Sequence, residues 1–287
     1  MTYKIRDLKV EFTLTDGEFE SGRGNVLTIT NGKVDCAISA YGGTSATQMD
    51  MSVWGLSLDY MAKISGKSQT QIQAKKNLVK VTADGEVVFV GTIISARINL
   101  TQSPDAPLEI TANTAGYYQA IPITDTYVKG PTTAQDVVKS ICNQVGLRFA
   151  NYGVDIPIKD VHFKGNAIEQ INKISSDYGF SFDLNTETIS IFKYGIAKDN
   201  IIPSVSSETG LIGYPVFYDL GIAFRCMFST AIVVARFIDL QTMLPNASGR
   251  YQVCEGTTHY LSSNVEGGFW ETYVVGFPVT PGVNDGK

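Results

Sequence analysis

The stretch Gly130–Lys193 most constrains the fold of this 287-residue chain, because it combines two short helix patterns with a hairpin pattern. Thr133 stands three residues ahead of Asp136 at the start of an apolar run, which is the pattern of a capped helix start. Apolar side chains then recur at helical spacing: Ala134, Val137, Val138, Ile141 and Val145. Gly146 follows as a stop signal. The sequence therefore predicts a helix that begins after Thr133 and ends at Gly146.

The same pattern returns about thirty residues later. Asn166 precedes Glu169 by three residues, and Gly179 ends the segment. The apolar face of this second helix consists of Ile168, Ile171, Ile174 and Tyr178. Phe180–Leu184 and Thr188–Phe192 then alternate in polarity around a short turn, as the two strands of a hairpin do. We therefore expect a compact module of two helices plus a hairpin, with a small core of its own.

Short strand patterns separated by turn signals fill the chain on both sides of this module. Before it, the predicted strands are Leu8–Leu14, Val26–Thr30, Val34–Ala40, Thr47–Trp54, Leu78–Ala83, Val87–Ile94 with an extension over Arg97–Leu100, and Leu108–Ala112, with a short helix at Leu58–Ile64. After it, they are Ile212–Tyr218, Ile222–Phe228, Ala231–Phe237, Tyr251–Thr257 and Trp270–Phe277. Asn31-Gly32 and Asp84-Gly85 are hairpin signals, whereas Gly116–Lys129 reads as irregular. Many short strands at close intervals are typical of a barrel or a sandwich.

We therefore predict an α+β fold that is mainly β. Two small antiparallel β-barrel domains, residues 1–115 and 201–287, flank the two-helix plus hairpin module at residues 116–200. The last residues, Thr280–Lys287, are rich in Pro, Gly and Asp and are expected to form a short flexible tail.

The charge of the chain restricts its partners. The net charge is -5, and 18% of the residues are charged, against about 25% in a typical soluble protein. This balance argues against nucleic-acid recognition and against an anionic membrane surface. Leu211–Leu240 is rich in apolar residues, but charged residues such as Arg225 and Arg236 interrupt it, so we expect no membrane insertion.

Signals for catalysis are weak. The two histidines, His162 and His259, belong to no spaced ligand pair, and the chain contains neither an HExxH nor a GxSxG motif. Glu255, Glu266 and Glu271 are acid candidates by number only. Cys36, Cys142, Cys226 and Cys254 are scattered without a CxxC pair, and the first residues lack an apolar leader segment, so we expect reduced thiols after cytosolic synthesis. We predict no catalytic, metal-ligating or cofactor-binding residues, and no enzyme activity.

The segment Ile222–Phe228 is apolar on both faces, which indicates either a core strand or a subunit interface. A β domain of fewer than about 90 residues has difficulty burying this much apolar surface within itself. We therefore favour an interface rich in aromatic residues and Met. The predicted interface residues are Tyr214, Phe217, Phe224, Met227, Phe228, Ile232 and Phe237.

The order of these elements resembles the baseplate hub (tail hub) proteins of contractile-tailed bacteriophages and related contractile injection systems. The segments that carry the resemblance are Gly130–Ile141, Phe163–Ile174, Tyr178–Asp183, Thr188–Phe192, Gly213-Tyr-Pro and Gly249-Arg-Tyr251. The resemblance implies a homotrimer in which two similar barrels per chain form a ring with pseudo-sixfold symmetry. Its partners would be the tail tube protein, the central spike protein and other baseplate proteins, in a virion tail assembled in the host cytoplasm. It transfers no site residues, and it leaves open an exchange of strands between the first and last regions.

Two alternatives remain at this level. One is a tail-associated peptidoglycan or polysaccharide hydrolase, which needs two carboxylates in a shared cleft. The other is a carbohydrate-binding β module, in which Trp54 or Trp270 would stack on a sugar. Tryptophan is more often a core residue, so the core interpretation is favoured for both.

Overall fold

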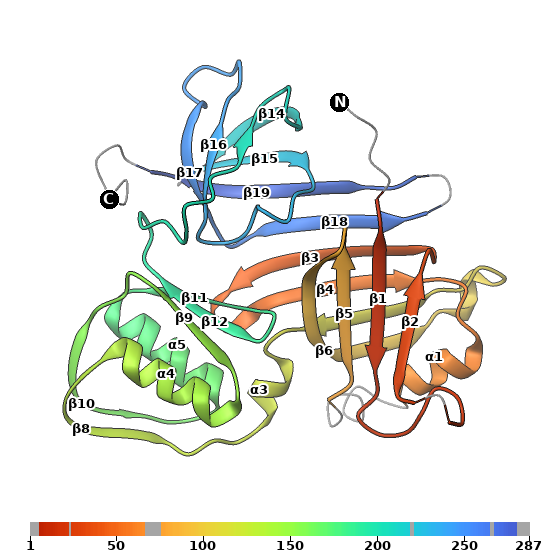
Figure 1. The fold of residues 1–287 in the computed structure, drawn as a ribbon, viewed down its shortest axis with the longest axis horizontal. Helices are drawn as coiled ribbons and strands as arrows, with labels where there is room; N and C mark the ends of the chain where they lie inside the picture. Colours follow the sequence, from red (N-terminus) through yellow and green to blue (C-terminus); the bar gives the residue numbers. More distant parts are fainter. Residues whose placement is uncertain (1–5, 23, 67–75, 219–220, 265–266, 280–287) are drawn as a thin grey trace.

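The computed structural model describes residues 6–22, 24–66, 76–218, 221–264 and 267–279, and it is mainly β (Figure 1). The first β region contains β1 (Leu8–Thr13), β2 (Val26–Thr30), β3 (Val34–Gly42), β4 (Ala46–Val53), β5 (Leu78–Ala83), β6 (Glu86–Ile98) and β7 (Leu108–Asn113), with helix α1 (Leu58–Ile64). The middle of the chain contains α3 (Gly116–Ala120), β8 (Thr126–Thr133), α4 (Ala134–Val145), β9 (Arg148–Tyr152), β10 (Pro157–Phe163), α5 (Ala167–Tyr178), β11 (Ser181–Asn185) and β12 (Thr188–Phe192). The last β region contains β13 (Ser204–Val205), β14 (Leu211–Tyr218), β15 (Gly221–Met227), β16 (Phe237–Leu240), β17 (Gly249–Val253), β18 (Thr257–Ser263) and β19 (Trp270–Pro278). Two single 3-10 turns cover Gly43–Ser45 and Leu100–Gln102.

A single 14-stranded sheet runs through both β regions, in the order β13-β16-β17-β19-β18-β3-β4-β7-β6-β5-β1-β2, with β14 on β15 and β15 on β19. The junction is the antiparallel pair β18–β3, in register from Thr257 opposite Ala40 to Ser263 opposite Val34. In Figure 1 the blue strands β18 and β19 lie directly beside the orange strands β3 and β4. Among the described strands, no pairing closes either half into a ring. The expectation of two separate small barrels is therefore corrected to one continuous sheet.

Four predicted features of the chain need further correction. The predicted strand Tyr251–Thr257 is divided, because β17 ends at Val253 and β18 begins at Thr257. The Asn31-Gly32 turn is present, with Asn31 at φ 56°, but the strand before it, β2, does not form a hairpin with the strand after it. Instead β2 pairs with β1, where Leu27 lies opposite Phe12 and packs on the first core. The run Ala231–Phe237 is not a strand, because most of it forms buried turns between cores and only Phe237 begins β16. Gly116–Lys129 is not irregular, since it contains α3 and the start of β8. The Asp84-Gly85 hairpin between β5 and β6 is confirmed, with both residues at positive φ.

The middle module forms as its local signals predict. Thr133 and Asn166 cap the starts of α4 and α5, and Gly146 and Gly179 end them in left-handed conformations. Asn166 Oδ1 accepts from the Glu169 backbone N–H at 3.0 Å, and Glu169 Oε2 accepts from the Asn166 N–H at 3.0 Å. The two helices lie between the ribbon β8–β10 and the sheet β11-β12-β9, in which β9 runs parallel to β12 (Figure 1).

Separate hydrophobic cores correspond to the three parts of the chain. The first core fills the first β region and also takes in Phe228 and Leu261 from the last region. The second lies inside the module, and the third lies within the last β region. A small fourth cluster of Phe192, Val234 and Ala235 sits where these parts meet. The domain boundaries at 115/116 and 200/201 stay predictions.

Asn166→Ala is expected to lower the free energy of unfolding by about 1 kcal/mol, because it removes the acceptor of a helix N-cap. Urea unfolding followed by circular dichroism measures this loss. Ser176→Ala, at an exposed position inside the same helix, is the matched control and should leave stability unchanged or slightly raised. An equal loss in both variants would contradict a capping role for Asn166.

Candidate subunit interface

Strand β14 projects from the sheet as an edge strand with exposed aromatic residues. Tyr214 is 69% exposed, Val216 66% and Phe217 51%. Among the described residues β14 pairs with β15 alone, and its ladder shifts register between Ile212 and Val216. Gly213 (φ 70°) stands in this irregular stretch, and proline and glycine are characteristic of edge strands and bulges. The adjacent Pro215 is buried. Apolar side chains are therefore displayed on both faces of one strand.

A groove of about 530 Å³ lies beside these residues, between β14, β15 and β19. Tyr214, Val216 and Tyr218 line one wall, and Tyr273 and Arg225 line the other. The Arg225 guanidinium donates to the Glu271 carboxylate on the neighbouring strand β19, so its charge is compensated within the chain. Contiguous exposed aromatic surface beside a groove is typical of a protein–protein contact site.

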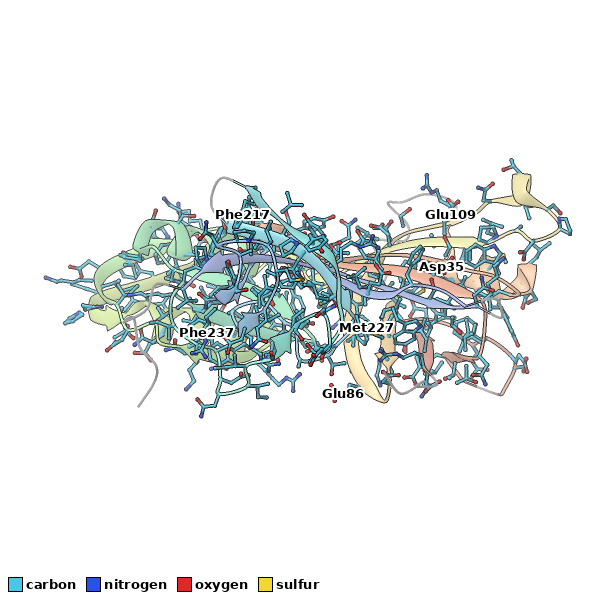
Figure 2. The ribbon with its side chains drawn as sticks, turned by 90° about the horizontal axis from the view of Figure 1, so that it is seen from above. Asp35, Glu86, Glu109, Phe217, Met227 and Phe237 are labelled. Carbon is cyan, nitrogen blue, oxygen red and sulfur yellow. The ribbon has the colours of Figure 1, made fainter. Side chains whose placement is uncertain are left out.

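The structure divides the seven predicted interface residues into two groups. Tyr214, Phe217 and Met227 are exposed, and Figure 2 shows Phe217 on one face of the molecule and Phe237 toward the other. Four belong to the chain's own cores, with exposures of 4% or less: Phe224, Phe228, Ile232 and Phe237. The side chains of these four are not available to a partner.

The physical reason is the alternation of β15. Phe224 and Cys226 face the third core, and Phe228, just after the strand, packs its ring 5.5 Å from Trp270 and 5.2 Å from His259. Sequence reasoning left Val216, Tyr218 and Tyr273 out of the set. The available signal for the first two was Gly213 and Pro215 inside a strand pattern, which indicates an edge.

The catalytic candidates occupy structural positions. His259 Nδ1 and Thr272 Oγ1 form a hydrogen bond of 2.8 Å, in which either atom can be the donor. Burial lowers the pKa of His259 to about 4. His162 lies on the module surface, 3.7 Å from Asp125. The Glu255 carboxylate accepts from the Tyr194 hydroxyl, and Glu271 is paired with Arg225. Glu266 lies outside the described residues.

The cysteines and tryptophans are also accounted for by packing. All four cysteines are buried and reduced, and burial raises the pKa of each thiol to about 12. The Trp270 Nε1 donates to the Ser262 carbonyl at 2.7 Å, and the Arg6 guanidinium lies 5.2 Å from its ring centre. The Lys33 ammonium lies 4.5 Å from the centre of the Trp54 ring. In the described part of the chain, no cluster of three or more His, Cys, Asp or Glu side chains is arranged to hold a metal ion. No helix there is long and apolar enough to cross a membrane.

An open groove of about 600 Å³ on the outer face of β18, β3, β4, β7 and β6 contains three carboxylates, those of Asp35, Asp50 and Glu109. Figure 2 shows Asp35 and Glu109 on the same side of the sheet. Each accepts from a neighbouring side chain: Asp35 from Ser262, Asp50 from Thr111 at 2.8 Å, and Glu109 from Asn99 at 3.1 Å. The groove therefore contains acids that neighbouring side chains hold, and Arg97 in the same lining lies 3.7 Å from Glu109.

Comparison with known families identifies the family of the chain. A family model described as "Baseplate hub gp41" matches residues 61–271. The chain belongs to this baseplate hub family. The resemblance inferred from the sequence is thereby confirmed, and the chain is a baseplate hub protein. Hub family members are structural components of the tail baseplate. Among curated protein sequences, none matches this chain.

Solved structures share the hub fold at low sequence identity. A tail protein from Neisseria meningitidis MC58 has a TM-score of 0.64 at 11% identity, over 96% of this chain and 97% of that chain. The 43 kDa tail protein of prophage MuSo2 from Shewanella oneidensis has a TM-score of 0.62 at 8% identity, over 94% and 99%. A type VI secretion component of E. coli, described as structurally similar to the T4 tail proteins gp27 and gp5, has a TM-score of 0.61 at 9% identity, over 94% and 77%. At these identities the likeness concerns the fold.

Proposed function

We propose that this hub protein works as a homotrimeric ring in a contractile tail, where it adapts the sixfold tail tube to the threefold central spike. Three copies carrying two similar β halves each would present six similar units around one axis. The protein acts by symmetry matching and mechanical anchoring rather than by catalysis. It contacts the tube protein, the spike protein and other baseplate proteins in the virion tail, and it is assembled in the host cytoplasm.

The similarity of the two β halves supports this ring. Each half contains one long strand that changes neighbours along its length. In the first half, β6 pairs with β5 over residues 86–92 and with β7 over residues 92–98. In the second half, β19 pairs with β18 over residues 270–273 and with β17 over residues 276–278. These two strands also carry short runs of similar composition, each of β-branched and aromatic residues ending at a glycine: Val88-Phe-Val-Gly91 and Tyr273-Val-Val-Gly276.

The observation that carries the proposal is the exposed edge strand β14. Its Tyr214, Val216 and Phe217 side chains are each more than half exposed, and Tyr214 and Val216 line the groove together with Tyr273. Leaving such a patch in water is unfavourable by about 25 cal/mol per Å² of apolar surface. We assign this strand to the contact between copies.

The mass of the particle tests the trimer. Native mass spectrometry or sedimentation at micromolar concentration, with tube and spike proteins present, is expected to give particles that contain three copies of the 31.2 kDa chain. A protein that stays strictly monomeric under these conditions contradicts the proposal. The partners belong in the experiment because ring closure can depend on them.

The double variant Tyr214→Ser/Phe217→Ser is expected to weaken association at least tenfold, since truncating a central aromatic residue of an interface typically costs about 2 kcal/mol or more. The matched control is Tyr127→Ser/Phe269→Ser, which removes one tyrosine and one phenylalanine of similar exposure, 68% and 62%, elsewhere on the surface. Sedimentation equilibrium compares the two. Equal association constants for the two double variants would contradict an interface at β14. Weaker association of the control variant alone would place the interface at the site of Tyr127 and Phe269.

The acidic groove supplies the test of the hydrolase alternative. Clearing of purified peptidoglycan by the wild-type protein, abolished by Asp50→Asn or Glu109→Gln, would favour an enzyme over the hub proposal. For the carbohydrate-binding alternative, added polysaccharide would quench the fluorescence of Trp54 or Trp270. We expect neither effect.

A further inference from the structure

A small cavity of about 110 Å³ lies where the module meets both β regions. Its walls are formed by strands β3 and β4, the start of β6, the end of β11, the segment 230–234 and β18. Its polar lining includes Thr47, Asp183, Asn185, Thr257 and His259. A water molecule occupies about 30 Å³ in the liquid, so the cavity has room for a few of them.

Three buried oxygen atoms in this lining have no hydrogen-bond partner within the described chain: Thr47 Oγ1, Asp183 Oδ1 and Asn185 Oδ1. Thr47 is 3% exposed and Asp183 is 6% exposed, so bulk solvent does not reach them freely. A buried polar atom without a partner is destabilising, and native proteins commonly satisfy such atoms with enclosed water. The polar character and the size of the cavity meet both conditions for a hydrated site.

The backbone beside the cavity is held in place. The Leu184 carbonyl accepts from Thr114 Oγ1 at 2.8 Å, and that hydroxyl accepts from the Thr47 backbone N–H at 3.2 Å. Both hydrogen bonds are buried, and through Thr114 they connect β11 of the module to the start of β4. Asp183, the residue before Leu184, therefore remains at the cavity while the module is docked.

The charged and titratable groups around Asp183 come from several elements. Burial raises the pKa of Asp183 to about 6, Glu255 on the β17–β18 turn adds to the rise, and the nearby Lys198 ammonium opposes it. Among the described residues no ion pair joins Lys198 to Asp183, and Lys198 lies 5.4 Å from the centre of the Tyr152 ring. Glu86, the first residue of β6, and His259 on β18 also line the cavity.

We propose that this cavity is a water-filled, proton-linked joint. Enclosed water bridges Thr47, Asp183 and Asn185, and the docking of the module onto the two β regions is tightest when Asp183 carries a proton. The neutral acid donates one hydrogen bond into the cavity and removes a buried charge that faces Glu255. Ionisation reverses both effects. The joint therefore weakens as the pH rises.

The pH range follows from the sign of the shift. The folded-state pKa of Asp183, about 6, lies above its unfolded value of 3.8, so the folded protein binds the proton more tightly. The loss of stability caused by ionising Asp183 is therefore absent below pH 3.8, grows between pH 3.8 and about pH 6, and is complete above about pH 6. Since each unit of pKa is a tenfold change in the folding equilibrium, the full penalty is about a hundredfold.

Asp183→Asn tests the proposal, because it keeps the shape and removes the charge. Urea unfolding of both proteins from pH 4 to pH 8 is expected to show the variant about a hundredfold more stable at pH 7.5, with the difference vanishing near pH 4. Asp177→Asn, at a solvated ion pair on α5, is the control and should show no comparable dependence on pH. A difference that does not change with pH, or a variant less stable at pH 7.5, would overturn the proposal.

Two further measurements keep the result decisive. Replacing tetramethylammonium chloride by sodium or calcium chloride at constant ionic strength should leave the stability of both proteins unchanged. A gain in stability confined to the wild type would instead assign the cavity to a cation and contradict the proposal. If the variant fails to fold, carbon-13 NMR of the wild-type carboxyl groups decides. A buried aspartate that titrates near pH 6 supports the joint, and titration of every aspartate near pH 4 contradicts it.

Discussion

Ile171→Ala is expected to lower the free energy of unfolding of the module by about 3–4 kcal/mol, the range for a large-to-small change in a packed core. Ile171 is fully buried on α5, in the same core as Val138 and Ile141 of α4. Both helices of the module pack into this one core, so little rearrangement is available to refill the space. Urea unfolding measures the loss, and amide exchange within α4 and α5 localises it.

Two further variants make the measurement specific. Ile171→Val removes one methyl group and should cost about 0.5–1.5 kcal/mol, in proportion to the volume lost. Lys173→Ala, on the exposed face of the same helix, breaks an ion pair with Asp177 at 2.5 Å and should cost less than about 0.5 kcal/mol. A loss for Ile171→Ala no greater than that for Lys173→Ala would show that the module does not depend on this core.

The module was predictable because its signals are local. Each helix is specified by a cap, an apolar stripe and a terminal glycine within about fifteen residues, and the hairpin after α5 is specified by its turn. The structure confirms both helices from Ala134 to Val145 and from Ala167 to Tyr178. The sequence resemblance to hub proteins relied on this same stretch.

The pairing of the β regions was not predictable, because it depends on contacts between distant residues. Strand β18 lies on β3 across more than two hundred residues, and nothing near Thr257 indicates that partner. The Asn31-Gly32 turn likewise determines a local bend without determining which strands pair. The interface prediction missed the burial of Phe224 for a related reason. Alternation shows that β15 has two apolar faces, but only the long-range fold shows that the third core covers one of them.

Gln252→Leu is expected to lower the free energy of unfolding by about 2–4 kcal/mol, because it removes three hydrogen bonds from a buried side chain to backbone groups, each worth about 0.5–1.5 kcal/mol. Gln252 is 1% exposed. Its Oε1 accepts from the Gly195 N–H at 2.6 Å, and its Nε2 donates to the carbonyls of Ile196 at 2.8 Å and Ala235 at 3.1 Å. One side chain thus attaches the segment that leaves the module to the last β region.

Gln241→Leu is the matched control, since it makes the same chemical change at an exposed position in the same region and should alter stability by less than about 0.5 kcal/mol. Hydrogen exchange adds a local measurement, because the Gly195 amide loses its acceptor in Gln252→Leu and should exchange faster than in the control. Unchanged exchange at Gly195 together with unchanged unfolding would contradict the role of Gln252. Faster exchange with unchanged global stability would also contradict the predicted loss, because it would mean that the attachment of this segment is uncoupled from the cores on either side.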